Sequence, residues 1–356
     1  MSCAPAAGAL PLERRPTRAE EPEVSRPTPN DPAAALPHLD SRRAAELAGR
    51  LRAQVERALR GKSEVVRQSV EAWVAGGHLL LEDVPGVGKT TLAHALARSV
   101  DASFRRIQFT SDLLPADLLG ASVPELRDGR PSGRFVFQPG PLFAQVVLGD
   151  EINRASPKTQ SALLEAMAEG AVSVDGVAHP LPQPFLVIAT QNPVEHHGTH
   201  PLPESQLDRF LLRLRIGYPD PADEAAVLRD DPAATELPRL EAVLHGDDLR
   251  AMRAAAERVK VDDRLVAYLL EIVRATREHP QVRLGASPRG AVALRRAAQA
   301  RALVDGRDYC IPEDVRDLAV PVLAHRVWLD PRESGGAAEE AEWILREILD
   351  AAAVPL

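Results

Sequence analysis

A glycine-rich segment with a single lysine is the first part of this sequence whose residue types can do chemistry. It is Pro85-Gly86-Val87-Gly88-Lys89-Thr90-Thr91, preceded by a short apolar run and followed by a helical pattern. Glycines let the backbone turn several N–H groups toward one anion, and the N-terminus of the following helix favours negative charge. Lys89 would neutralise the β- and γ-phosphate oxygens of a nucleotide, and Thr90 would offer its hydroxyl to Mg²⁺. The segment therefore predicts a phosphate-binding loop.

Two features of the composition bear on this loop. Of the 43 Lys and Arg residues, only Lys62, Lys89, Lys158 and Lys260 are lysines, so a lysine inside a motif is more informative here than usual. Asp83 stands where the pattern G-x-x-x-x-G-K-[ST] has its first glycine. That position forms the entry turn and does not touch phosphate, so we expect the loop to absorb the change. A GTPase would need an Asn-Lys-x-Asp segment, which the sequence lacks, and ATP is therefore favoured.

An acidic pair follows the apolar run 146–149. Carboxylates at the carboxyl end of a parallel strand face the crevice where nucleotides bind. Asp150 is then placed to hold the Mg²⁺ shell, and Glu151 to orient or deprotonate an attacking water. Taken alone, an Asp-Glu pair is an ordinary polar loop start. Its position downstream of the Lys89 loop favours the catalytic interpretation.

A further apolar run, 185–190, delivers Gln191 and Asn192 just before Pro193. If its strand lies between the other two, an amide at its end reaches both the γ-phosphate and the water. We assign this role to Asn192. The alternative is a simple Asn-Pro turn.

Two arginines are candidates for stabilising the charge that develops in phosphoryl transfer, either in the same subunit or from a neighbour. Arg209 lies in Leu207-Asp208-Arg209-Phe210, far from Lys89 in sequence. Arg289 follows Ser287-Pro288, where serine suits a helix cap and proline the first helical position, so Arg289 is directed outward from the helix start. Arginine is so common in this chain that a surface ion pair is an equally good interpretation of each.

The elements that must position these residues alternate along the chain. Short apolar runs predict strands at 78–82, 106–109, 144–148 and 185–190, and helical patterns at 40–59, 63–75, 90–99 and 157–169 separate or precede them. This alternation predicts an α/β fold with a parallel sheet covered on both faces. After residues 217–221 the pattern is helical almost throughout. We therefore expect an α/β domain at 39–218 and an all-α domain at 219–356.

Composition indicates what to expect of the N-terminal segment, the location and the partners of this protein. The 356 residues exceed the size at which single cores usually divide, and residues 1–38 hold eight of the 31 prolines, which predicts a disordered arm. Hydrophobic content of 45%, without an apolar run near the roughly 20 residues that span a bilayer, predicts no membrane insertion. Two cysteines and the lack of a secretory signal favour a cytoplasmic protein. The net charge of −8 disfavours nucleic acid as a general partner.

Taken together, these motifs resemble the MoxR-type AAA+ ATPases over roughly residues 45–328. The motifs are long and occur in the family's order, and Asp83 in place of glycine is also common there. The segments that carry the resemblance are 78–90, 108–115, 150–154, 157–167, 189–193, 201–210 and 322–326. The resemblance implies the P-loop NTPase sheet flanked by helices, followed by a smaller all-α lid domain. It also implies an insert at 120–141 and a hairpin at 172–177, where Asp175-Gly176 is a turn signal in its own right.

The resemblance also implies roles. Lys89 and Thr90 would be Walker A residues, and the 150–151 pair would be Walker B. Asn192 would be sensor 1, Arg209 the finger that reaches the ATP of an adjacent subunit, and Arg289 the sensor 2 contact from the lid.

A finger that acts on a neighbour implies a ring, expected to be a hexamer. The family implies ATP hydrolysis to ADP and phosphate with Mg²⁺, and chaperone-like remodelling of protein complexes. Its clients would be metalloenzymes or other assemblies, and its partners often bear von Willebrand factor A domains.

Two alternatives stay open. A motor acting on nucleic acid would need basic hairpins, for which the first insert supplies Arg127, Arg130 and Arg134. A nucleotide-gated scaffold would bind ATP without useful turnover, although the presence of Glu151 and Asn192 speaks against it.

Overall fold

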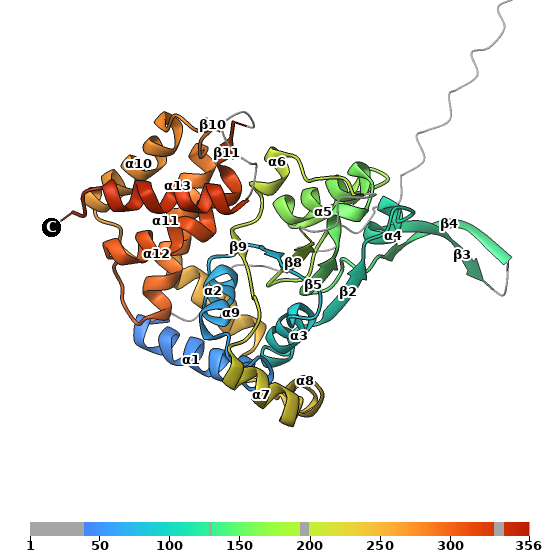
Figure 1. Ribbon diagram of the computed structural model, residues 1–356. Coiled ribbons are helices and arrows are strands. Elements are labelled where there is room, and N and C mark those ends of the chain that lie inside the picture. Colours follow the sequence, from blue (N-terminus) through green and yellow to red (C-terminus); the bar gives the residue numbers. More distant parts are fainter. Residues whose placement is uncertain (1–38, 128–129, 193–198, 331–337, 356) are drawn as a thin grey trace, which may run out of the picture. The chain divides into compact units, whose positions relative to one another are not determined.

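A five-stranded parallel sheet forms the centre of the α/β half of the chain, which ends after β9, in the computed structural model (Figure 1). The strand order is β2-β5-β8-β1-β9, so β8 lies between β1 and β5, as the role assigned to Asn192 requires. The four predicted strands are present, and β9 is an addition to them. The strands are β1 (Leu79–Glu82), β2 (Phe104–Gln108), β5 (Val146–Asp150), β8 (Leu186–Gln191) and β9 (Leu212–Leu214).

The structure describes residues 39–127, 130–192, 199–330 and 338–355. The predicted disordered arm, 1–38, lies outside the described residues, as does Pro193. Within the described ranges, no helix combines the length and apolarity needed to cross a bilayer.

Alternate residues of β1, β5 and β8 serve two hydrophobic cores, because successive side chains of a strand point to opposite faces. Leu79 and Leu81 belong to a core that includes helices α1, α2 and α3, whereas Leu80 belongs to the core on the other face, with α4 and α5. All three leucines are fully buried. The helices of this half are α1 (Ser41–Ala58), α2 (Ser63–Val74), α3 (Lys89–Ser99), α4 (Pro115–Leu119), α5 (Pro157–Glu169) and α6 (Glu204–Leu207), with the short 3-10 helix η1 (Ile152–Arg154).

The second half is helical, as predicted, and local caps set several of its helix starts. Asp220 accepts hydrogen bonds from the N–H groups of Ala222 and Asp223, and Pro221 occupies the first position of α7. The elements are α7 (Pro221–Asp230), α8 (Pro232–Thr235), η2 (Leu237–Arg239), α9 (Gly246–Glu257), α10 (Asp263–Glu278), α11 (Pro288–Val304), α12 (Pro312–Leu323), η3 (Ala324–Arg326) and α13 (Ala338–Ala351).

One detail of the all-α prediction is wrong. Strands β10 (Val282–Leu284) and β11 (Trp328–Leu329) form a short antiparallel pair. Strands of three and two residues are too short to show the alternation of apolar and polar residues by which a strand is predicted. In addition, α1 and α2 pack against α11, and one continuous core extends from the sheet into the helical half. The division into 39–218 and 219–356 therefore stays a prediction.

Two antiparallel hairpins extend from the α/β half, at the two places where inserts are expected. The longer pairs β3 (Gly120–Arg127) with β4 (Arg130–Pro139) and projects away from the sheet in Figure 1. The shorter pairs β6 (Ala171–Val174) with β7 (Val177–Pro180). Its turn residues Asp175 and Gly176 have φ of 51° and 77°, the positive values that this turn requires. Stacked rings of Phe137 and His179, 3.8 Å apart, join the two hairpins.

A buried histidine at the start of β1 makes stability depend on pH. His78 Nδ1 accepts a hydrogen bond from Val187 N at 3.0 Å, so Nε2 carries the proton and donates to Met167 O at 3.2 Å. Both nitrogens are therefore used by the neutral ring. Burial lowers the pKa of His78 to about 4. Between about pH 6.5 and 4, the unfolded chain binds a proton at this position that the folded chain does not.

We therefore expect the stability that His78 contributes above pH 6.5 to be lost as pH falls toward 4, by on the order of 3 kcal/mol. The measurement is urea unfolding of the wild type and His78→Gln at pH 7.5 and 5. Glu71 has a pKa raised by burial to about 7, which acts in the opposite direction, but it is common to both proteins and cancels in the difference. A stability difference that is the same at both pH values would contradict this prediction.

Candidate nucleotide-binding site

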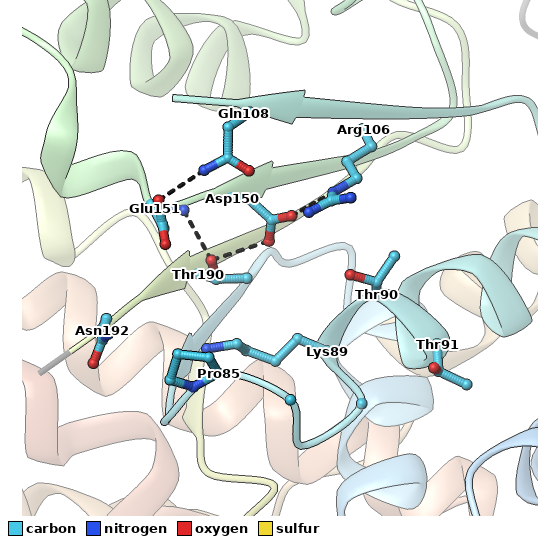
Figure 2. Close-up of a pocket in the computed structure, with 12 residues that line it drawn as sticks. Pro85, Lys89, Thr90, Thr91, Arg106, Gln108, Asp150, Glu151, Thr190 and Asn192 are labelled. Atoms are coloured by element: carbon cyan, nitrogen blue, oxygen red, sulfur yellow. Dashed lines mark hydrogen bonds and ion pairs between the residues drawn. The ribbon is translucent and has the colours of Figure 1, made fainter. Parts of the chain in front are cut away.

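A cavity of about 330 Å³ opens at the carboxyl ends of the central strands (Figure 2). The loop after β1, the first turn of α3 and the ends of β2, β5 and β8 supply its walls. Every predicted phosphate-loop residue except Val87 lines it. The side chain of Val87 instead packs against the hydrophobic core. The lining residues are Pro85, Gly86, Gly88, Lys89, Thr90, Thr91, Arg106, Gln108, Asp150, Glu151, Thr190 and Asn192.

The backbone of the loop after β1 has the conformation that only glycine adopts readily. Gly86 and Gly88 have φ of 87° and 100°, and a Cβ on Gly88 would lie 2.7 Å from Leu59 Cδ1. Gly88 is also the residue before α3, where it offers no side chain to cap the helix. The first N–H groups of α3 therefore remain directed toward the cavity, where an anion would satisfy them. This arrangement fits a phosphate chain.

Lys89 and Asp83 are linked at the entrance of this loop. Lys89 Nζ donates to the carbonyl oxygen of Asp83 at 2.7 Å. Burial lowers the pKa of the Lys89 ammonium, and the nearby Asp83, Asp150 and Glu151 oppose this shift. The Asp83 carboxylate accepts from Val84 N and, at 2.6 Å, from Gly217 N.

Asp83 therefore ties the loop to the segment that leads into the helical half, a contact a glycine cannot make. Its backbone lies outside the positive-φ region, so no glycine is needed there. The expectation that the loop absorbs Asp83 is consistent with both observations.

The carboxylate of Asp150 ends β5 inside the cavity. Its Oδ1 accepts from Thr190 Oγ1 at 3.2 Å and its Oδ2 from Arg106 Nε at 2.6 Å. The carboxylate of Asp150 and the hydroxyl of Thr90 are hard oxygen ligands of the kind Mg²⁺ prefers, and both line this cavity. The donor set fits a magnesium ion. Because Arg106 balances the charge of Asp150 here, a metal ion at this carboxylate would replace that guanidinium.

Glu151 is held in a strained backbone conformation. Its φ of 57° and ψ of 50° lie in the left-handed region, which non-glycine residues adopt mostly where the surroundings enforce it. Glu151 N donates to Thr190 Oγ1 at 2.9 Å, and Oε2 accepts from Gln108 Nε2 at 2.7 Å and Arg154 Nη1 at 3.0 Å. The strain turns the carboxylate into the cavity rather than along the strand, and Figure 2 shows it beside Gln108.

Asn192 follows β8, the strand between the phosphate-loop strand and the Asp150 strand. Its side chain lines the cavity, and the residue is 8% exposed. The strand order needed for an amide at this position is confirmed. Its bond to a γ-phosphate or a water stays a prediction.

Arg209 and Arg289 lie elsewhere. Both line a second cavity of about 390 Å³, together with Asp208, Arg296 and Arg326, and neither lines the cavity around Lys89. Half-buried Arg209 donates to the carbonyl oxygen of Leu164 in α5, and its Nε has no hydrogen-bond partner among the residues that the structure describes.

Arg289 is exposed, and its Nε lies 4.0 Å from Asp208 Oδ2. As predicted, Ser287 caps α11 by accepting from Gly290 N, and Pro288 takes the first helical position. The structure brings the two arginines together but does not bring either to this chain's own phosphate loop.

Sequence reasoning missed Arg106, Gln108 and Thr190, although signals existed for them. Arg106 and Gln108 are two residues apart on β2, and alternate residues of a strand share a face. Thr190 lies beside Asn192 in the same motif. For Asp208 and Arg326, which are 118 residues apart and form a 2.6 Å ion pair, no local pattern exists.

Two family profiles match the chain. The one described as "ATPase family associated with various cellular activities (AAA)" matches residues 78–212, which run from the start of the sheet to β9 and hold the whole cavity around Lys89. The one described as "AAA lid domain" matches residues 274–348, from the end of α10 into α13.

Several known proteins are similar over most of their length. "Uncharacterized protein YeaC" of Bacillus subtilis is 49% identical over 87% of this chain and 95% of its own length. "Chaperone MoxR1" of Mycobacterium tuberculosis is 41% identical over 85% and 81%, respectively. The crystal structure of a candidate ATPase from Cytophaga hutchinsonii superimposes with a TM-score of 0.80, at 35% identity, over 89% of this chain and 97% of that one. The parallel sheet, the matched AAA and lid profiles and these relatives show that the chain belongs to the MoxR-type AAA+ ATPases.

Proposed function

We propose that this chain is a cytoplasmic ATPase that binds Mg-ATP, hydrolyses it to ADP and phosphate, and uses the cycle in a ring to remodel protein complexes. One observation carries the proposal. The ends of three adjacent strands, β5, β8 and β1, bring two carboxylates, an amide and a lysine-bearing glycine loop to a single cavity.

Each residue of this cavity has a task in the proposed reaction. The N–H groups of the glycine loop and the first turn of α3 bind phosphate oxygens, and Lys89 neutralises their charge. Thr90 and Asp150 hold the magnesium ion, which when bound withdraws charge from the phosphates. Glu151 orients the attacking water and accepts its proton. Asn192 donates its amide to the γ-phosphate or the water.

The second cavity supports a ring. Among the residues that line the cavity around Lys89, the one arginine is Arg106, and it is paired with Asp150. The second cavity gathers Arg209, Arg289 and two further guanidinium groups around one carboxylate, Asp208. A concentration of positive charge of this kind suits a polyphosphate supplied by a neighbouring subunit. We therefore assign both arginines to the adjacent subunit's ATP. A closed ring of such head-to-tail contacts follows, expected to be a hexamer.

The client is proposed to be a protein. Two apolar side chains on the β3–β4 hairpin are strongly exposed, Phe135 at 71% and Leu126 at 64%. Exposed apolar groups on a projecting element are typical of protein contacts. A similar protein that carries the name chaperone agrees with this assignment. Proteins with von Willebrand factor A domains, and metalloenzymes in assembly, are the partners that the family resemblance suggests.

The test combines hydrolysis with assembly. We expect phosphate release to need both ATP and Mg²⁺, sedimentation to show a ring, and neither DNA nor RNA to stimulate turnover. ATP binding without turnover would favour a nucleotide-gated scaffold, and strong stimulation by nucleic acid would favour a motor.

A further inference from the structure

The last motif of the family resemblance, residues 322–326, has no task in the mechanism above. The structure places its arginine against the segment that carries Arg209. Arg326 Nε donates to Asp208 Oδ1 at 2.6 Å. Arg326 Nη2 donates to the carbonyl oxygens of Asp208 at 3.0 Å and Phe210 at 2.6 Å, and Nη1 to that of Leu211 at 3.2 Å. One side chain therefore bonds the backbone on both sides of Arg209.

These hydrogen bonds are buried from solvent. The Arg326 side chain is 3% exposed, and burial lowers the pKa of its guanidinium, while the bond to Asp208 opposes that shift. A buried guanidinium is stable only where its N–H groups all find acceptors. Here the one remaining N–H, on Nη1, meets Val322 O, and the neighbouring His325 places its own Nε2 3.0 Å from Phe210 O. The geometry is therefore tightly determined.

Asp208 extends the network to Arg289. Its Oδ1 is held by Arg326, while its Oδ2 lies 3.4 Å from Ser287 Oγ and 4.0 Å from Arg289 Nε. Ser287 is also the cap of α11. The same carboxylate thus connects the residue beside Arg209 to the start of the helix that presents Arg289.

We infer that Arg326 is a positioning residue for the arginines that complete the neighbouring subunit's ATP site. It holds the backbone around Arg209 and, through Asp208, the start of α11, so that both guanidinium groups are presented as one unit. This inference rests on the proposed function, in which Arg209 acts on a neighbour. Although Arg326 lines the second cavity, its N–H groups are used by acceptors within the chain, so we assign its effect to backbone placement and not to contact with the nucleotide.

The test is Arg326→Lys, which keeps the charge but loses the branched donors. We expect kcat to fall about a hundredfold, the cost of misplacing a reacting group by about 1 Å, with ATP affinity and ring mass unchanged. Arg316→Lys is the matched control, because Arg316 lies on α12, the helix just before η3, and likewise bonds a backbone carbonyl, that of Leu349, away from Arg209. It should retain wild-type turnover.

Mixed rings separate positioning from a general structural defect. An Arg326→Lys subunit keeps its own ATP site around Lys89 intact, and a Glu151→Gln subunit keeps its Arg209 finger correctly placed. Random mixing in equal amounts should therefore restore about a quarter of the sites. The double variant Arg209→Ala/Arg326→Lys should be no slower than Arg209→Ala alone.

The outcomes distinguish the inference from the function on which it rests. Normal turnover of Arg209→Ala would refute the shared site itself. If Arg209→Ala is inactive but Arg326→Lys keeps wild-type kcat, or loses activity that mixing does not restore, the positioning role is wrong. Should Arg326→Lys fail to fold, Gly290→Ala replaces it, since its Cβ would lie 3.1 Å from Arg326 Cδ and push that side chain aside by a few tenths of an ångström. A wild-type kcat for that variant overturns the inference, and a lowered kcat restored by mixing supports it.

Discussion

Lys89→Ala is expected to abolish ATP turnover and to weaken ATP binding by at least about 2 kcal/mol, or ~30-fold, the lower bound for removing one partner of a buried charge pair. The reason is local. Lys89 is the cation at the entrance of the glycine loop, and its ammonium lies half-buried within the electrostatic reach of Asp83, Asp150 and Glu151. Without it, these carboxylates would repel the phosphates.

Calorimetric titration with ATP and phosphate release measure the two effects of Lys89→Ala. The chain offers a matched control in Lys158, an exposed lysine in the first turn of α5 that does not line the cavity. Lys158→Ala should bind and hydrolyse ATP as the wild type does. If Lys89→Ala retained wild-type affinity, the cavity around it would not be the nucleotide site.

Arg209→Ala is expected to leave ATP affinity unchanged and to lower kcat by about 10³- to 10⁵-fold, the range for loss of an arginine finger. The separation of the two effects follows from the structure, because Arg209 does not line the cavity around Lys89 but a second cavity with Arg289. Removing it leaves the phosphate loop of its own subunit intact. What is lost is charge stabilisation in the neighbour.

Mixing provides the decisive readout for Arg209. Equal amounts of Arg209→Ala and Glu151→Gln, each inactive alone, should together regain turnover, since some interfaces then combine an intact Glu151 with an intact Arg209. Arg250→Ala is the control, because Arg250 is an exposed arginine of α9 whose partner is the adjacent Asp247. If Arg209→Ala alone hydrolyses ATP at the wild-type rate, or if the mixture shows no hydrolysis, then adjacent subunits do not share their ATP sites.

Helix boundaries were predictable wherever the signals were local. The helix Pro157–Glu169 begins and ends at the predicted residues, and the helix Pro288–Val304 begins at the predicted proline. Ser156 and Ser287 cap them, each is followed by proline at the first position, and Gly170 ends the first of them in a left-handed conformation. In contrast, β9 and the β10–β11 pair went unpredicted, because strands of two or three residues form only when a neighbouring backbone is already in place.

The sequence by itself determined which residue types stand at the ends of the apolar strands, and hence the chemistry that Lys89, Asp150, Glu151 and Asn192 can perform. Only the tertiary structure decided that β8 lies between β5 and β1, so that these groups share one cavity. It also decided that Arg326 bonds Asp208, across 118 residues. The physical reason is that caps, turns and periodicity act within a few residues, whereas strand order and buried ion pairs depend on which surfaces meet once the whole core has packed.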